Sequence, residues 1–192
     1  MRGPLSGDLS LADADARLAG ASANDYSGYP VTGAGDLDAD GYADVLVASL
    51  GAALAGSGPG RAHLFRGAFS GHLDLDEADA ILTGESDGDY AGQGLCRAGD
   101  LDGDGRDDLL LGAPRHQVPA FGGGAVYVFF EMPQGSVSLA AADEVLAGEH
   151  AQDLAGQAVG SVPDGDGAAL LVGAPGYQDG RARGAAYLIQ VE

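Results

Sequence analysis

The sequence predicts an all-β protein built of four-stranded antiparallel units, the blades of a β-propeller. Three observations favour this class: a repeat of about 64 residues, short apolar runs between glycine-rich turns, and the lack of any sustained helical period. The repeat is clearest in Leu18-Ala19-Gly20, which returns as Leu82-Thr83-Gly84 and as Leu146-Ala147-Gly148. We therefore expect one domain over 1–192, with repeats of approximately 1–64, 65–128 and 129–192.

Each repeat is expected to hold four short strands in a fixed order. A first strand ending at glycine is expected at 17–19, 80–82 and 144–146, and a glycine-rich second strand at 28–33, 92–97 and 156–159. The third strand is purely apolar, at 45–47, 109–111 and 170–172, and the fourth carries the aromatic residues, at 63–65, 126–129 and 186–189. An apolar run without alternation indicates a strand covered on both faces, as when one sheet stacks on the next.

The position in the repeat at which the chain starts and finishes indicates how the blades could assemble. The chain opens on what would be the outermost strand of a blade and finishes on the strand beside that position. Propellers close with about 4–8 blades, so three blades form a partial propeller or half of a larger ring. Two copies that exchange terminal strands would make a six-bladed ring without open edges, so we expect self-association into a dimer.

Two acidic loops of the form D-x-D-x-D-G-x-x-D lie in register in the first two repeats. Their carboxylates are Asp36, Asp38, Asp40 and Asp44 in the first loop, and Asp100, Asp102, Asp104 and Asp108 in the second. The seventh residues, Tyr42 and Arg106, are expected to add a main-chain carbonyl, and the glycine at the sixth position permits the sharp turn. Such a set of hard oxygens suits Ca²⁺, which accepts 6–8 flexible oxygen ligands.

Two comparisons within the chain sharpen this prediction. An EF-hand needs a glutamate at loop position 12 and flanking helices, but Val47 and Leu111 stand there and strands follow. The third copy of the loop, at 162–170, keeps the middle acids but has Val162 and Leu170 at positions 1 and 9. We therefore expect two calcium sites and a degenerate third loop.

The sequence also resembles a known family. An apolar run followed by Gly-Ala-Pro, at 111–114 and 172–175, after an acidic loop is similar to the FG-GAP repeat of integrin α-subunit propellers. The first copy departs to Ala48-Ser49-Leu50, and the "FG" half is altered to Tyr26-Ser27-Gly28 and its counterparts. The resemblance covers essentially the whole chain. It implies calcium at the two intact loops, an extracellular or cell-surface location, and a face opposite the loops that binds partners.

Composition excludes several other functions. The formal net charge is −20, and no lysine occurs, so nucleic acid is not an expected partner, and neither Schiff-base chemistry nor a P-loop is available. No apolar run approaches the roughly 20 residues that span a bilayer, so membrane insertion is not expected, and no signal peptide is recognised at Met1. Cys96, the one cysteine, is interpreted as a small core residue.

One short motif matches the sequence pattern of a catalytic serine. Gly84-Glu85-Ser86-Asp87-Gly88 matches the nucleophile elbow G-x-S-x-G, but a glycine-broken stretch follows it where a helix is required. The histidines at 63, 72, 116 and 150 lack zinc-site spacing, and His63 is expected to pack in a strand where its counterpart is Tyr127. We therefore predict a non-catalytic, calcium-binding propeller for protein or glycan recognition. The alternatives are an accessory propeller of a larger secreted hydrolase and a self-assembling structural ring.

Overall fold

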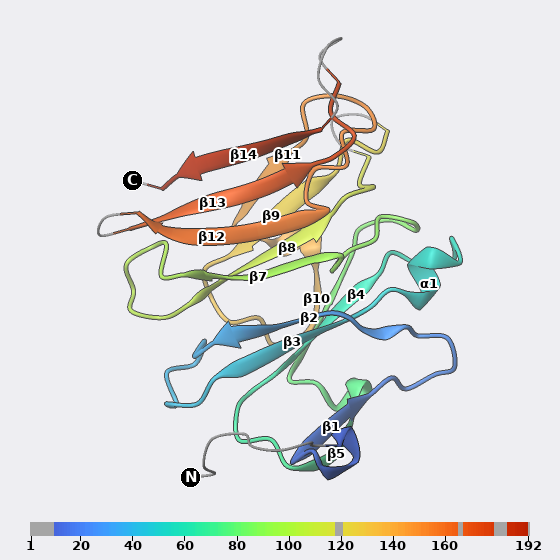
Figure 1. Ribbon diagram of the computed structural model, residues 1–192, viewed down its shortest axis with the longest axis vertical. Coiled ribbons are helices and arrows are strands. Elements are labelled where there is room, and N and C mark those ends of the chain that lie inside the picture. Colours follow the sequence, from blue (N-terminus) through green and yellow to red (C-terminus); the bar gives the residue numbers. More distant parts are fainter. Residues whose placement is uncertain (1–9, 118–120, 165–166, 179–183, 192) are drawn as a thin grey trace.

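The structure, a computed structural model, describes residues 10–117, 121–164, 167–178 and 184–191 (Figure 1). Within these residues the chain is almost entirely β-structure, as the sequence predicts. The helical elements are single turns: α1 (Gly51–Leu54) and the 3-10 turns η1 (Leu11–Asp13), η2 (Leu75–Glu77) and η3 (Leu139–Ala141).

The strands form three larger sheets and one small pair, which follow one another along the molecule (Figure 1). The first sheet contains, in order, β10 (Gly135–Ser138), β6 (Ala80–Thr83), β4 (Arg61–Phe65), β3 (Asp44–Ser49) and β2 (Ser27–Gly35). The second contains β11 (Glu144–Ala147), β9 (Ala125–Phe129), β8 (Asp108–Ala113) and β7 (Gly94–Gly99). The third contains β12 (Ala158–Asp164), β13 (Gly167–Ala174) and β14 (Ala185–Gln190), and the small pair is β1 (Ala16–Ala19) with β5 (Gly71–Asp74).

The four strand positions predicted in each repeat are confirmed, but the sheets do not coincide with the repeats. The outer strand of the first sheet, β6, belongs to the second repeat and pairs antiparallel with β4. Likewise β11 belongs to the third repeat and pairs with β9. The first and second sheets therefore take their outer strand from the following repeat, whereas within the described residues the third sheet has three strands, all from the third repeat. The number of blades in a complete ring stays a prediction.

Two short strands were not predicted. β5 lies parallel to β1, and β10 lies parallel to β6, so each adds a further strand outside an outer strand. The sequences GHLD and GSVS contain one large apolar residue each, which is too weak a pattern to indicate a strand. Their pairing depends on the open edge of a strand that lies far away in the sequence.

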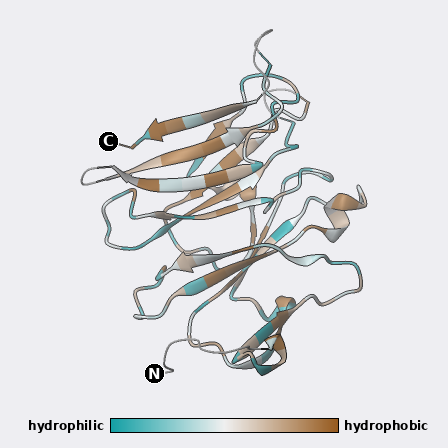
Figure 2. Ribbon diagram, viewed as in Figure 1, coloured by the Kyte–Doolittle hydropathy of each residue, from teal (hydrophilic) through white to brown (hydrophobic). Residues whose placement is uncertain are grey.

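The core lies between the sheets, where the central strands are covered on both faces. Every residue of β8 is buried, as the apolar run predicts, and Figure 2 shows apolar residues along the central strands β3 and β13 as well. The second strands of successive sheets lie against each other, β2 against β7 and β7 against β12. One apolar cluster joins the first and second sheets, and another joins the second and third. This stacking fixes how the loops at the ends of neighbouring sheets face each other.

Two further sequence interpretations concern the core. His63 lies on β4 and is buried, as expected; its Nδ1 donates to the carbonyl of Leu75 (2.9 Å), and its Nε2 lies 2.8 Å from Ser49 Oγ. Cys96 on β7 is partly buried against the second apolar cluster, and burial raises the pKa of its thiol. A raised pKa disfavours the thiolate, which agrees with a packing role.

Candidate metal centres

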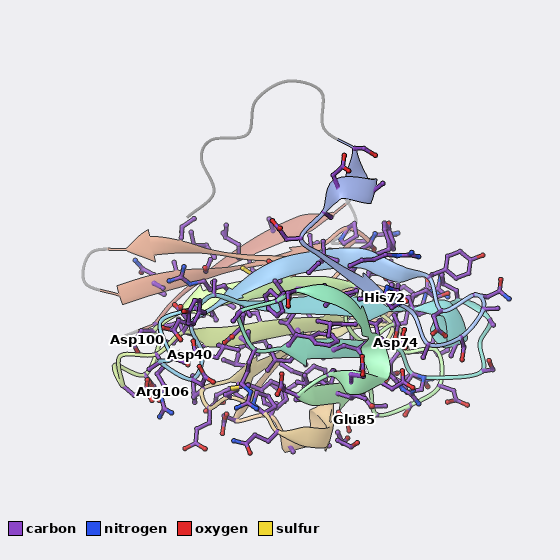
Figure 3. All side chains as sticks on the ribbon, turned by 90° about the horizontal axis from the view of Figure 1, so that it is seen from below. Asp40, His72, Asp74, Glu85, Asp100 and Arg106 are labelled. Atoms are coloured by element: carbon purple, nitrogen blue, oxygen red, sulfur yellow. The ribbon has the colours of Figure 1, made fainter. Side chains whose placement is uncertain are left out.

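The two acidic loops connect equivalent strands, so the fold places them at the same end of neighbouring sheets. The first loop joins β2 to β3 and the second joins β7 to β8. Figure 3 shows Asp40, Asp100 and Arg106 gathered at one end of the molecule. Because β2 lies against β7, the loops that follow these strands also lie near each other. The amide N–H of Asp36 donates to Asp107 Oδ2 at 3.1 Å, which links the first loop directly to the second.

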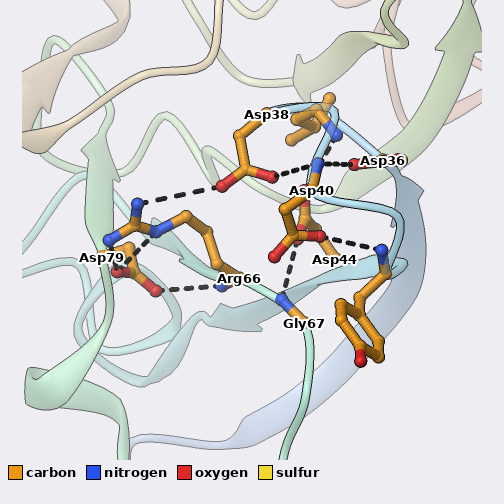
Figure 4. Close-up of polar contacts among 9 residues, drawn as sticks. Asp36, Asp38, Asp40, Asp44, Arg66, Gly67 and Asp79 are labelled. Carbon is orange, nitrogen blue, oxygen red and sulfur yellow. Dashed lines mark hydrogen bonds and ion pairs between the residues drawn. The ribbon is translucent and has the colours of Figure 1, made fainter.

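In the first loop, carboxylates fold back onto the backbone of the turn (Figure 4). Asp36 accepts hydrogen bonds from the amides of Asp40 (3.0 Å) and Gly41 (3.0 Å), one on each oxygen. Asp38 Oδ1 accepts from the amide of Asp40, and Asp40 Oδ1 accepts from the amide of Tyr42. These contacts bring oxygens of Asp36, Asp38 and Asp40 within 4.8 Å of one another.

The second loop repeats most of this network. Asp100 accepts from the amides of Gly103 (2.7 Å) and Gly105 (2.9 Å), and Asp102 Oδ1 accepts from the amide of Asp104 (3.0 Å). Oxygens of Asp100, Asp102 and Asp108 lie within 4.8 Å of one another. In each loop the structure thus gathers three of the four predicted carboxylates into one cluster, but the ninth position takes part only in the second.

The ninth position explains this difference. Asp44 and Asp108 are both fully buried, and Oδ2 of each accepts an amide hydrogen bond, from Leu37 (2.9 Å) and Leu101 (2.6 Å). Oδ1 of Asp44 accepts a further bond from the amide of Gly67 at 2.9 Å, whereas the buried Oδ1 of Asp108 has no hydrogen-bond partner. Asp108 therefore keeps an oxygen that a cation can satisfy.

Electrostatics follow the same contrast. Burial raises the pKa of Asp44, with smaller contributions from the charges of Asp38 and Asp40. For Asp108, burial and then the charges of the other loop carboxylates raise the pKa to about 6, against the lowering effect of the Leu101 amide. A cation at either cluster would offset the mutual repulsion of these carboxylates.

The fifth and seventh positions differ between the loops. Asp104 Oδ2 accepts a hydrogen bond from Arg106 Nε at 2.8 Å and forms an ion pair with Nη2 at 2.6 Å, and this pairing lowers the pKa of Asp104. The corresponding Asp40 has Tyr42 beside it, whose side chain is largely exposed. The carbonyl ligands expected from Tyr42 and Arg106 stay predictions.

Both clusters fit a hard divalent cation. The donors are carboxylate oxygens on a tight turn, and the buried oxygen of Asp108 needs a partner. The third copy of the loop is built differently. β12 and β13 pair up to Asp164 opposite Gly167, so Val162 and Leu170, at positions 1 and 9, both lie in strands. Asp166 lies outside the described residues, and the expected lack of a tight third site stays a prediction.

Comparison with known families accounts for this arrangement. The family model of the FG-GAP repeat matches residues 97–129, and that of an FG-GAP-like repeat matches residues 36–111. The chain is an FG-GAP repeat domain. Both matches include the second acidic loop, and the longer one runs from the first residue of the first loop.

The domain is similar to parts of two integrin chains of Drosophila melanogaster. It is 32% identical to Integrin alpha-PS2 over 178 residues, which is 88% of this chain and 12% of that protein. It is 36% identical to Integrin alpha-PS5 over 103 residues, which is 52% of this chain and 9% of that protein. The FG-GAP domain thus spans about a tenth of the length of these relatives.

The structure also explains which part of the FG signature is kept. The glycines Gly28, Gly92 and Gly156 have φ values of 89°, 90° and 87°, a left-handed conformation that glycine adopts most easily. The first residue of the signature varies as Tyr26, Tyr90 and Leu154, with φ between 51° and 60°. The backbone shape of the FG turn therefore repeats although its side chains change.

Three charged residues near the FG-GAP acidic loops were missed in the sequence. Asp107 accepts from Arg97 Nε (2.7 Å) as well as from the Asp36 amide, and a Cβ at Gly35 would collide with its carboxylate. Arg66 lies just after β4, with Nη1 at 3.8 Å from Asp38 Oδ2 and Nε at 2.9 Å from Asp79 Oδ1 (Figure 4). Asp107 was missed because it occupies the eighth position of its loop, where the calcium pattern requires no particular residue. Arg66 was missed because only the pairing of β4 with β3 brings it near the first loop.

The serine motif has a structural role in the FG-GAP repeat. The amide of Ser86 donates to Asp89 Oδ2 at 2.8 Å, and the same contact joins Ser22 to Asp25 and His150 to Asp153. The turn leads into β7 and not into a helix. His116 Nδ1 also contacts Asp89 Oδ2, at 3.1 Å, so the histidine holds the turn. Ser86 is therefore a turn residue that varies between repeats.

Proposed function

We propose that this FG-GAP domain is a non-catalytic, calcium-binding propeller module for protein or glycan recognition outside the cell. The observation that carries the proposal is the matched pair of acidic loops, each with a cluster of three carboxylates at the same end of neighbouring sheets. Calcium would bridge the carboxylates and stiffen the turns, which would hold neighbouring sheets in a fixed relation. Extracellular calcium modules work with dissociation constants of about 10⁻⁴–10⁻³ M, so millimolar calcium would fill such sites.

The recognition surface would lie at the opposite ends of the strands. There a pocket of about 570 Å³ is lined by Arg115, Phe121 and Gln152, among others, between turns of the second and third sheets. Arg115 lies over the ring of Tyr90, 4.6 Å from its centroid, and Phe121 is largely exposed. Arginine and exposed aromatic side chains are the residue types that anchor protein interfaces, and aromatic faces also stack on sugars.

Similarity to integrin chains supports a recognition role and an extracellular location. Among the described residues, no helix has the length and apolar character needed to cross a bilayer.

Calorimetric titration with CaCl₂ tests the metal assignment. We expect two calcium ions per chain, one ion for Asp100→Asn or for Asp36→Asn, and none for the double variant. Asp74→Asn, an exposed carboxylate outside both loops, is the matched control and should still bind two. A stoichiometry that none of the loop variants changes would contradict the assignment.

A glycan microarray and a panel of immobilised extracellular-matrix proteins test the recognition role. We expect binding that requires calcium and that falls at least about 10-fold in Phe121→Ala, the change expected for a central aromatic anchor. Tyr29→Ala, also an exposed aromatic but on β2, is the control and should bind normally. Binding that Phe121→Ala leaves intact would rule out this surface.

A further inference from the structure

Three leucines occupy the same place in the repeat, but one of them is exposed and the other two are buried. Leu11, Leu75 and Leu139 are each the first residue of a 3-10 turn, in η1, η2 and η3, and they lie 64 residues apart. Leu75 and Leu139 are 1% and 0% exposed, whereas Leu11 is 95% exposed. The local backbone is the same in all three, so the difference depends on what each leucine packs against.

The two buried leucines enter equivalent apolar clusters. Leu75 is buried with Val47 and Phe65, against which Leu18 packs. Leu139 is buried in the cluster that contains their counterparts in the next sheet, Leu82, Leu111 and Phe129. Leu75 directly follows β5, and Leu139 directly follows β10. Each leucine therefore fills an apolar space beside the strand with which β5 or β10 pairs, β1 or β6.

The third such space is a pocket that Leu11 of the same chain does not reach. Leu146, Val172 and Ile189 are the counterparts of the residues around Leu75 and Leu139, and all three line a pocket of about 290 Å³. η1 leads through Ala14 and Asp15 directly into β1, and Figure 1 places β1 and β14 at opposite ends of the molecule. One chain therefore presents both an exposed leucine and the pocket that matches it.

The strand edges show the same complementarity. β9 is buried throughout, because β11 covers its edge, whereas residues of β14 alternate between partly buried and exposed. Leu188 is 59% exposed, but its counterpart Val128 is 3% exposed. At the other end β1 pairs with β5 alone, in a two-stranded parallel sheet, and such small sheets are marginal without further partners.

We propose that a second copy of this chain covers β14 with its β1 and inserts its Leu11 into the pocket of Leu146, Val172 and Ile189. Because each copy offers both halves of the contact, two copies would close reciprocally into a ring of six sheets, within the usual range for propellers. The register follows from the other sheets, where Ala80 faces Leu64 and Glu144 faces Val128. Ala16 of one copy then faces Leu188 of the other, and Ala19 faces Ala185. This inference is independent of the proposed recognition role.

Light scattering on the full chain over a range of protein concentrations tests the dimer. We expect a mass of twice 19.0 kDa for the unsubstituted 192-residue chain. Leu11→Asp would bury a charge at both contacts, so we expect it to weaken the dimer at least about 100-fold. Because Leu11 is exposed in the single chain, circular dichroism and the fold of each copy should not change.

Leu54→Asp is the matched control, since Leu54 is 47% exposed on α1, away from β1 and β14. It should remain dimeric. An unsubstituted chain that stays at 19.0 kDa at all concentrations would overturn the proposal, and so would a dimer that Leu11→Asp leaves intact. Open chains of increasing mass would overturn the closed ring.

Disulfide trapping tests the register. In a Cys96→Ser background, Ala16→Cys in one copy should cross-link to Leu188→Cys in the other under mild oxidation. Ala19→Cys with Leu188→Cys is the matched control, because three residues of strand separate the two positions by about 10 Å, beyond disulfide reach. Cross-linking of the control pair instead of the first pair would show that the assigned register is wrong.

Discussion

The first and second acidic loops share one nine-residue pattern but differ in what the fold places around it. In the first loop the amide of Gly67 donates a hydrogen bond to Oδ1 of Asp44, and Arg66 lies beside Asp38. In the second loop Oδ1 of Asp108 has no hydrogen-bond partner, and Arg106 pairs with Asp104 within the loop. The pattern thus sets which oxygens converge, while neighbouring strands set how strongly they need a cation. We expect the second loop to bind calcium more tightly.

Calcium itself should have the largest effect on stability. At a free concentration of about 100 times the dissociation constant, each site would add about 2.7 kcal/mol, or about 5–11 °C in melting temperature for a chain of this size. Differential scanning calorimetry with CaCl₂ and then with chelator measures this. As calcium rises, the expected gain comes in two steps, with the second loop filling first. A melting temperature that ignores calcium would contradict both sites.

Substitutions at the ninth position should separate the two loops. Asp108→Asn removes a cluster ligand, so we expect the affinity of the second site to fall on the order of 100-fold. In chelator its melting temperature should fall less than that of Asp44→Asn, because only the Leu101 amide has its acceptor weakened. Asp44→Asn instead weakens the acceptors of the Leu37 and Gly67 amides, so the melting temperature should fall with and without calcium. Calorimetry and calcium titration of both variants check this. Equal behaviour of the two would remove the proposed difference between the loops.

A smaller effect is expected at Arg66, where a substitution should make the calcium affinity of the first loop more similar to that of the second. Arg66→Gln removes a positive charge 3.8 Å from Asp38, so calcium affinity at the first site should rise about 2- to 5-fold, as expected for an exposed ion pair. The second site should not change. Arg61→Gln, at the other end of β4, is the control and should leave both affinities unaltered. Titration of the Asp100→Asn background, where only the first site binds, isolates the effect.

The smallest expected effect is the pH dependence that His63 gives to the first sheet. Burial lowers the pKa of His63 from 6.5, and the counterpart in the second sheet is Tyr127. Below pH 6.5 the unfolded chain binds a proton that the folded chain does not, so this stability is complete above pH 6.5 and is lost as the pH falls toward the lowered pKa. Asp108, whose pKa is raised to about 6, changes stability in the opposite direction over this range, so the His63 contribution is the difference between the unsubstituted protein and His63→Gln. When both are melted in chelator from pH 7.5 to 5.5, the unsubstituted protein should lose more stability than the variant. An unchanged slope in the variant would assign the loss to other groups.

Much of this could be predicted because the repeat shows the same pattern several times. The strand positions, the burial of His63 and the two carboxylate clusters follow from register and residue type alone. β5 and β10 could not be predicted, because four residues with one large apolar side chain carry no clear period. Arg66 and Asp107 were missed because each reaches the first loop across a strand pairing or a sheet contact.

The sequence by itself determined the four main strands of each repeat, the acidic loops and the turn glycines, since each depends on residues within about ten positions of one another. Only the tertiary structure decided which sheet each strand joins, which oxygen of Asp108 has no partner, and which leucine is buried. Leu11, Leu75 and Leu139 illustrate the reason. Identical local sequence positions gain or lose nearly all their burial according to whether another part of the fold lies beside them, and hydrophobic burial depends on that neighbour.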